Sequence, residues 1–243
     1  MSVPRFYCPQ LPQCAGLAEL PEQAAHHAAR VLRLKEGDRA TVFNGHGGEG
    51  EARVAAIGKR GVSVEITAWH AFERESPLRV MLAQAISAGE KMDFTLQKAV
   101  EMGVAAIQPL ASERSVVRLS GERADKRVAH WQGVVVAACE QSGRNRVPEV
   151  APIRSLLDWL PEQDGNDLRL MLMPQAEIRL HNLDQPTGRV TLLIGPEGGL
   201  SPLEAEAAQR FGFTPVRLGA RILRTETAAL AALAAMQTLW GDF

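Results

Sequence analysis

The chain has 243 residues and a formal net charge of −1 at pH 7, and 46% of the residues are hydrophobic. This composition is sufficient for a packed core and excludes a low-complexity chain, and no apolar run is long enough to cross a membrane. The first residues lack the apolar stretch of a signal peptide and the three cysteines show no C-x-x-C spacing, so we expect a cytoplasmic protein without disulfides or a metal site.

The first part of the chain follows a mostly β pattern after one helix. The segment PEQAAHHAARVLR at 21–33 predicts a single helix with an apolar face. Three short alternating segments follow it, at 39–44, 51–57 and 62–68. Turns that contain glycine separate them, as tight hairpins require. One helix with several short strands predicts a small β-barrel domain over residues 1–72.

The charged segment HAFERESPL at 70–78 marks the domain boundary, and strands and helices alternate after it. Strands are predicted at 78–85, 105–110, 168–173, 190–195 and 214–218. Helices are predicted at 90–103, 124–143 and 225–240. Near-continuous apolar strands are typical of a parallel sheet that is covered by helices on both faces. Residues 73–243 are therefore expected to form one α/β domain.

The helix at 225–240 is apolar almost all the way round, so more than one of its sides must be buried. A second subunit that covers its outer side is one solution, and a helix inside the core of its own domain is the other. The periodicity of the sequence does not separate these two solutions.

The glycine-rich loop GPEGG at 195–199 connects a buried strand to a helix, at the edge of the sheet where parallel α/β proteins bind ligands. Ser201 is the predicted N-cap of this helix, and Pro202 is its first residue. Glu204 stands three residues after the cap and completes a capping box. The sequence therefore defines the start of the helix closely.

A bound phosphate does not fit this loop. Its spacing matches neither common phosphate-binding motif, Pro196 donates no N–H, and the carboxylate of Glu197 would repel phosphate charge. Gly198 and Gly199 have no side chain, so a ligand can approach their backbone closely. The loop suits a phosphate-free ligand that tolerates or carries positive charge, and S-adenosylmethionine fits that description. A plain tight turn is the alternative.

The segment LGARILRTETA at 218–228 repeats this order of strand end, glycine, polar turn and helix. Thr225 is the predicted N-cap of the last helix. Two such loops at neighbouring strand ends can form the walls of one pocket. Arg221 and Arg224 lie three residues apart at the start of the helix, so we expect one of them to face the pocket, where it can hold an RNA phosphate or a base oxygen.

The motifs LLIGPEGGLSPLE and LGARILRTETAAL resemble the RsmE family, the bacterial 16S ribosomal RNA uridine-N3 methyltransferases of the SPOUT class. Blocks such as HHAARVLRLKEGD and AACEQSGRNRVPEV are also similar to the family, so the resemblance covers nearly the whole chain. It implies a PUA-like RNA-binding barrel followed by a SPOUT α/β domain with a parallel sheet and a C-terminal deep trefoil knot. It also implies S-adenosylmethionine as cofactor, a homodimer, and the 16S rRNA of the small ribosomal subunit as partner.

The resemblance places the cofactor pocket at three strand ends. The residues expected to bind S-adenosylmethionine are Leu172, Met173, Ile194, Gly195, Glu197, Gly198, Gly199, Leu218, Gly219, Ile222, Leu223 and Thr225. In the implied reaction, uridine N3 attacks the methyl carbon, but N3 carries a proton that must leave. Arg224 is expected to stabilise the resulting anion or to position the base, and Glu197 and Glu226 are candidates for the base.

Cationic side chains supply most of the salt-dependent affinity for RNA. The residues expected to bind RNA are Arg5, Arg30, Arg33, Lys91, Arg114, Arg144 and Arg146. The last two belong to the turn GRNR at 143–146, which follows the end of a helix and is expected to direct both arginines outward. For each of these arginines, an ordinary solvated surface charge is the alternative.

Two other classes of function stay open on the sequence alone. One is a nucleotide-binding or dinucleotide-binding enzyme, which Pro196 and Glu197 disfavour. The other is a non-catalytic RNA-binding or ribosome-assembly protein that has kept the same scaffold. Binding of S-adenosylmethionine separates this second class from the methyltransferase.

Overall fold

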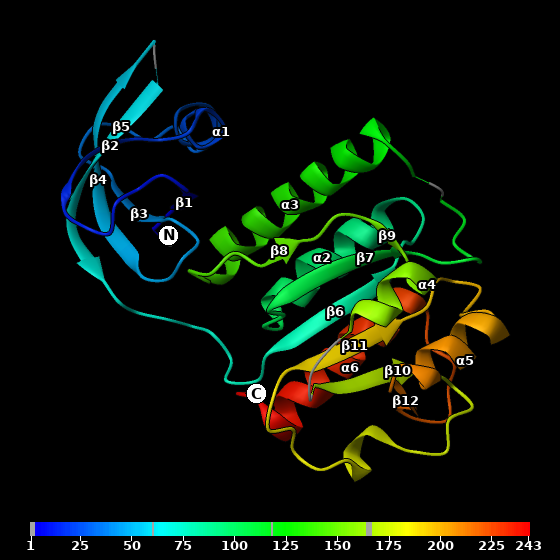
Figure 1. Ribbon diagram of the computed structural model, residues 1–243. Helices are drawn as coiled ribbons and strands as arrows, with labels where there is room; N and C mark the ends of the chain where they lie inside the picture. The colour runs from blue at the N-terminus through cyan, green and yellow to red at the C-terminus, as the bar shows by residue number, and fades with distance from the viewer. Residues whose placement is uncertain (1–2, 60, 118, 164–166) are drawn as a thin grey trace. The chain divides into compact units, whose positions relative to one another are not determined.

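The computed structural model describes residues 3–59, 61–117, 119–163 and 167–243 (Figure 1). The chain forms two compact units, the first made of Met1–Glu75 and Cys139–Val147 and the second of Ser76–Ala138 and Pro148–Phe243. The sequence places the boundary near residue 72 and assigns the mid-chain segment 139–147 to the second domain. The structure differs here, because this segment belongs to the first unit.

The first unit contains a five-stranded sheet in the order β1-β3-β4-β5-β2. Its strands are β1 (Arg5–Tyr7), β2 (Gly16–Glu19), β3 (Arg39–Phe43), β4 (Glu49–Gly58) and β5 (Gly61–His70). β1 runs parallel to β3, and the other neighbouring strands are antiparallel. The sequence predicts a small β-barrel here, and among the described residues the edge strands β1 and β2 of this sheet do not pair with each other.

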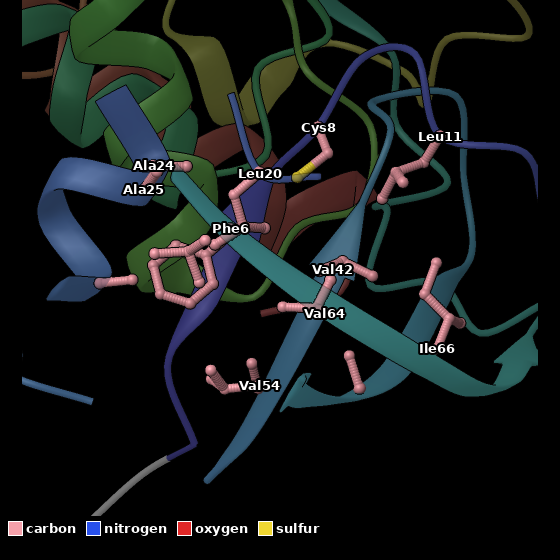
Figure 2. Packing of buried hydrophobic residues seen from close by; sticks show 14 residues of the cluster. Phe6, Cys8, Leu11, Leu20, Ala24, Ala25, Val42, Val54, Val64 and Ile66 are labelled. Atoms are coloured by element: carbon pink, nitrogen blue, oxygen red, sulfur yellow. The ribbon is translucent and has the colours of Figure 1, made fainter. Parts of the chain in front are cut away.

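A buried apolar cluster forms the core of the first unit (Figure 2). Alternate residues of β4 and β5, such as Val54 and Val64, point into it and join Phe6. The predicted single helix is instead α1 (Glu22–His26), which continues into a π-helical turn over His27–Val31. Three buried alanines from these turns complete the cluster, because their small side chains let the helix approach the sheet closely.

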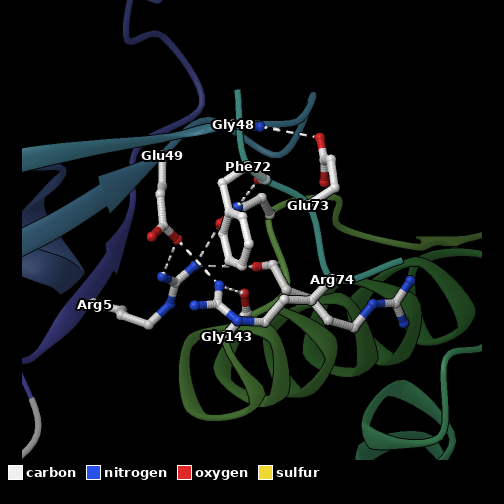
Figure 3. Close-up of polar contacts among 9 residues, drawn as sticks. Arg5, Gly48, Glu49, Phe72, Glu73, Arg74 and Gly143 are labelled. Atoms are coloured by element: carbon white, nitrogen blue, oxygen red, sulfur yellow. Dashed lines mark hydrogen bonds and ion pairs between the residues drawn. The ribbon is translucent and has the colours of Figure 1, made fainter. Parts of the chain in front are cut away.

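Polar contacts hold the mid-chain segment in the first unit (Figure 3). Arg5 donates from Nη1 to Glu49 Oε2 at 2.6 Å, and from Nη2 to Asn145 Oδ1 at 2.6 Å. Arg74 donates from Nη1 to the carbonyl oxygen of Gly143 at 2.8 Å. Charge-assisted hydrogen bonds of this kind are stronger than neutral ones, so they fix the segment although it lies far from its partners in the sequence.

The second unit is built on a parallel sheet in the order β12-β10-β11-β6-β7-β8, and β9 also pairs with β7. Its strands are β6 (Val80–Ala85), β7 (Ala106–Ala111), β8 (Glu149–Val150), β9 (Arg154–Ser155), β10 (Leu168–Leu172), β11 (Val190–Ile194) and β12 (Thr214–Val216). The expected parallel α/β architecture is confirmed. The carboxyl ends of β12, β10 and β11 lie side by side, because these strands are neighbours in the sheet.

Helices cover both faces of this sheet (Figure 1). They are α2 (Glu90–Glu101), α3 (Glu122–Ser142), α4 (Leu156–Trp159), α5 (Pro202–Arg210) and α6 (Thr225–Trp240), with 3-10 turns η2 (Leu160–Glu162) and η3 (Leu180–Asn182). α4 and α5 share a buried cluster with Met171 and Leu193, whereas α2 and α6 pack together on the other face. In the part of the chain that the structure describes, we find no helix that is long and apolar enough to cross a membrane.

The last helix, α6, buries only one of its faces within the chain. Ala229, Leu233 and Met236 are fully buried, whereas Leu239 on the outer side is 43% exposed. Several outer alanines are only half-buried. One of the two solutions that its apolar sequence allows is enclosure in the core of its own domain. The exposed outer face argues against that solution.

Gly103 ends α2 as predicted, and its backbone leaves no room for a side chain. Its φ of +79° is left-handed, and a Cβ would lie 2.7 Å from Gln237 Nε2, which donates to the carbonyl oxygen of Met102 at 2.9 Å. Gly103→Ala is expected to lower the free energy of unfolding by about 2 to 4 kcal/mol, since it adds backbone strain and displaces a buried hydrogen bond. Gly37→Ala is the control, because Gly37 has a φ of +87° but open space around it.

The control should cost only the backbone strain of about 1 to 2 kcal/mol. Urea denaturation of both variants measures the difference. Equal losses in the two variants would contradict the proposed contact with Gln237.

Candidate functional site

A pocket of about 610 Å³ opens at the carboxyl ends of β10, β11 and β12. Its wall contains all of the residues that the sequence assigns to cofactor binding, namely Leu172, Met173, Ile194, Gly195, Glu197, Gly198, Gly199, Leu218, Gly219, Ile222, Leu223 and Thr225. The two loops predicted to form the walls of one pocket do line it, but their strands are not neighbours as predicted, because β10 lies between β11 and β12. Parallel strands bring these residues together, since their carboxyl ends lie at one edge of the sheet.

The glycine-rich loop turns sharply into α5. Gly199 has a φ of +68°, and its N–H donates to the carbonyl oxygen of Pro196 at 2.8 Å. The predicted capping box is confirmed: Glu204 N donates to Ser201 Oγ at 3.3 Å, and Ser201 N donates to Glu204 Oε2 at 2.9 Å. The capping box fixes the residue at which the loop ends and α5 begins.

Thr225 joins the two loops instead of capping α6. The N-cap of α6 is Arg224, which makes no side-chain cap, and Thr225 is the first helical residue. Thr225 Oγ1 donates to the carbonyl oxygen of Gly195 at 2.7 Å and accepts from Gln84 Nε2 at 3.1 Å. The predicted capping role of Thr225 is thus wrong, because its hydroxyl is used by the neighbouring strand and loop.

Sequence reasoning missed Gln84. This residue is fully buried in β6, and it links the central strand of the sheet to the start of α6 through Thr225. The available signal was one amide within the otherwise apolar strand LRVMLAQA. A buried polar side chain of this kind needs hydrogen-bond partners, which indicates a structural link at the strand end.

Glu197 is held at the pocket wall as an ion. Its Oε1 accepts from the backbone N–H of Ala88 at 3.2 Å and from Lys91 Nζ at 3.2 Å. Partial burial raises the pKa of Glu197. Its own backbone N–H, the Ala88 N–H and the Lys91 ammonium together lower the pKa by more, so the net pKa lies below the ordinary value. A carboxylate with a lowered pKa is a weak base, and this environment disfavours the base role predicted for Glu197.

Ionisation of Glu197 should therefore not contribute to the pH dependence of turnover. Because this carboxyl is already ionised, any rising limb of kcat between about pH 6 and 9 should persist unchanged in Glu197→Gln. The measurement is the pH–rate profile of both proteins at saturating substrate. A limb that disappears in the variant would show that Glu197 does act as the base.

Positive charge surrounds this pocket. Its basic residues are Lys91, Arg114, Arg217, Arg221 and Arg224, and Glu197 is its only acidic residue among those described. Lys91, Arg114 and Arg224 come from the sequence-based predictions. Both arginines of the second loop line the pocket, where the sequence predicts one of them. Glu226, the other candidate base, is absent from the described part of the pocket wall.

The remaining arginines predicted to bind RNA differ in exposure. Arg30 and Arg33 are exposed on the first unit. Arg146 is 57% exposed and lies 3.5 Å from Glu73. Arg5 and Arg144 face inward, which corrects the expectation that the turn directs both of its arginines outward.

Arg144 makes the more complete of these internal contacts. It is 4% exposed and donates from Nε to Glu75 Oε1 at 3.0 Å and from Nη2 to Glu75 Oε2 at 2.5 Å. Arg5 is bound by Glu49 and Asn145 and lies over the ring of Phe43. Arginines that are both buried and bonded within the unit in this way contribute little to an RNA-binding surface.

The chain matches two families of protein domains. Residues 74–237 match an RNA methyltransferase domain, and residues 20–67 match an RNA methyltransferase PUA domain. Among relatives, the ribosomal RNA small subunit methyltransferase E of Buchnera aphidicola is 36% identical, over 99% of this chain and 98% of its own length. The protein with the same name from Bacillus subtilis is 33% identical, over 88% of this chain and 87% of its own length.

Solved structures agree with this assignment. A ribosomal RNA small subunit methyltransferase E from Neisseria gonorrhoeae, bound to S-adenosylmethionine, is 44% identical with a TM-score of 0.93, and each chain is covered completely. A Legionella pneumophila protein described as a methyltransferase, also solved with this cofactor, is 40% identical with a TM-score of 0.95 and the same coverage. The chain therefore belongs to the ribosomal RNA small subunit methyltransferase E family, as the resemblance of its two C-terminal motifs implied.

Proposed function

We propose that the chain uses S-adenosylmethionine to methylate N3 of one uridine in the 16S rRNA of the small ribosomal subunit, in the cytoplasm. The observation that carries this proposal is the pocket at three strand ends, which combines every predicted cofactor residue with a surplus of positive charge. The two related structures solved with S-adenosylmethionine support the choice of cofactor.

The wall of the pocket suits this cofactor. Apolar side chains such as Leu172, Ile194 and Leu223 can surround the adenosine, and the exposed backbone at Gly198 offers groups for hydrogen bonds. Pro196 and Glu197, which disfavour phosphate, are no obstacle to a phosphate-free ligand. When bound, S-adenosylmethionine supplies a methyl group on a positively charged sulfur.

Arg224 is the proposed catalytic residue of the pocket. It lies at the N-cap of α6 with an exposed side chain, and it lines the pocket. Its permanently charged guanidinium can donate hydrogen bonds to the uracil oxygens. By stabilising the negative charge that spreads over N3 and these oxygens, Arg224 would ease the loss of the N3 proton. Lys91 holds Glu197 and so helps to fix the glycine-rich loop.

We also propose that the second unit is knotted and that the protein is a homodimer. The start of α6 follows the loop after β12, and the helix contacts η3, which belongs to the long loop after β10. This arrangement is compatible with a last helix that passes through an earlier loop. The half-exposed outer face of α6 is apolar, so a second copy of the chain can cover it.

Two measurements test the proposed function. Calorimetry should detect binding of S-adenosylmethionine. If the protein does not bind it, the alternative hypothesis of a non-catalytic RNA-binding protein is favoured. Primer extension on 16S rRNA should give a stop in the wild-type strain that a deletion strain loses, because a methyl group on N3 blocks the pairing edge of the base. An unchanged stop in the deletion strain would exclude this target.

A further inference from the structure

We propose that Glu204 is a positioning residue that holds Arg114 at the rim of the pocket, where Arg114 binds the RNA substrate. The inference rests on the proposed function and assigns to Glu204 a task beyond the capping of α5. Its basis is a set of hydrogen bonds that joins the loop after β7 to the start of α5.

Glu204 uses both of its carboxylate oxygens. It is 2% exposed, and its Oε2 accepts from Ser201 N at 2.9 Å and from Ser112 Oγ at 3.0 Å. Its Oε1 accepts from the backbone N–H of Glu113 at 2.8 Å. A capping box needs only the bond from Ser201, so the other two bonds serve a different purpose. They tie the loop that contains Ser112 and Glu113 to the start of α5.

Arg114 is the next residue of that loop, and it lies directly against the glycine-rich loop. Its Nη1 donates to the carbonyl oxygens of Gly198 at 3.1 Å and Leu200 at 3.4 Å. A Cβ on Gly198 would lie 3.3 Å from Arg114 Cβ, a tight contact, so glycine eases this approach. The peptide N–H bound by Glu204 is thus one residue from the arginine at the rim, and a shift of that peptide would move Arg114.

The charge of the pocket indicates what Arg114 binds. The methionine part of the cofactor has a single carboxylate beside an ammonium and a positively charged sulfur, so it does not account for a surplus of cations, whereas RNA carries one negative charge at each phosphate. Five basic side chains line a pocket whose described wall contains one carboxylate, and that carboxylate is paired with Lys91. Arg114 therefore suits the polyanionic substrate, and its guanidinium can form paired hydrogen bonds with a phosphate.

Glu204→Gln tests the positioning role directly. A glutamine has one accepting oxygen, and in either orientation its NH₂ group opposes a backbone N–H, of Glu113 or of Ser201. We expect KM for small ribosomal subunits from a deletion strain to rise about tenfold, as for the loss of one charge-assisted hydrogen bond, while kcat and the Kd of S-adenosylmethionine stay unchanged.

Two serine variants form a matched pair. Ser112→Ala removes only the hydroxyl bond from the loop to Glu204, and Ser201→Ala removes only the hydroxyl that accepts from Glu204 N. Both should lower the urea midpoint of unfolding by a similar amount, since each loses one hydrogen bond. Only Ser112→Ala should raise KM, by about threefold. Equal KM values in the two variants would show that helix stability alone matters and would overturn the proposal.

A double-mutant cycle identifies the route of the effect. If Glu204 acts through Arg114, then adding Glu204→Gln to Arg114→Ala should change KM by less than about twofold. Independent losses that multiply would overturn the proposal, and so would a loss of cofactor affinity in Glu204→Gln. If the wild type itself bound no S-adenosylmethionine, the proposed function would fail, and the effect of Glu204 on direct RNA binding would still decide the positioning role.

Discussion

Arg224→Ala should lower kcat by about 10² to 10³-fold, as for the removal of one preorganised donor to a developing anion. The Kd of S-adenosylmethionine should stay unchanged, because the guanidinium is proposed to bind the uracil and not the cofactor. The position of Arg224 in the pocket wall, at the start of α6, is the structural basis for this expectation.

Arg221→Ala is the matched control for this prediction. Arg221 belongs to the same loop, also lines the pocket and is also exposed, so its removal changes the pocket charge equally. It should affect the RNA KM more than kcat. Near-normal turnover in Arg224→Ala, with intact cofactor binding, would exclude Arg224 from catalysis. Arg224→Lys should recover only part of the rate, since an ammonium lacks the planar fork of donors.

Arg144→Ala should lower the free energy of unfolding of the first unit by about 3 to 5 kcal/mol. Its guanidinium bonds both oxygens of Glu75 and is almost completely buried, so its loss leaves a carboxylate without its main partner. Arg146→Ala should cost less than about 1 kcal/mol, because the 3.5 Å contact with Glu73 is exposed to solvent. Hydrogen exchange in β4 and in residues 139–147 measures both effects.

The double variant Arg144→Met/Glu75→Leu distinguishes a broken ion pair from general misfolding. Removing both charges avoids the unpaired carboxylate, so most of the lost stability should return. If the double variant is no more stable than Arg144→Ala, the ion pair is not the cause. For RNA binding, Arg146 should matter more than Arg144. Charge reversal at the exposed Arg146 should raise the KM for RNA, whereas charge reversal at the buried Arg144 should lower activity by destabilising the first unit.

The sequence predicted those features that depend on neighbouring residues. The capping box of Ser201 and Glu204 spans three positions, and strand–helix alternation follows from local apolar patterns. The pocket followed from placing two loops at the carboxyl ends of parallel strands. By contrast, Thr225 meets Gln84 across 141 positions and Arg5 meets Asn145 across 140, and no local pattern encodes such pairs. The same reason explains why Arg144 was expected at the surface.

The membership of Cys139–Val147 in the first unit has a consequence for dissecting the protein. The chain passes between the units at three places, after Glu75, after Ala138 and after Val147. One proteolytic cut cannot release an intact N-terminal module, and a fragment ending at residue 75 would leave Arg5 without Asn145 and Glu75 without Arg144. The PUA domain and the RNA methyltransferase domain can therefore not be exchanged as two consecutive segments. A gene fusion that exchanges one of them must transfer the mid-chain segment Cys139–Val147 together with the PUA domain.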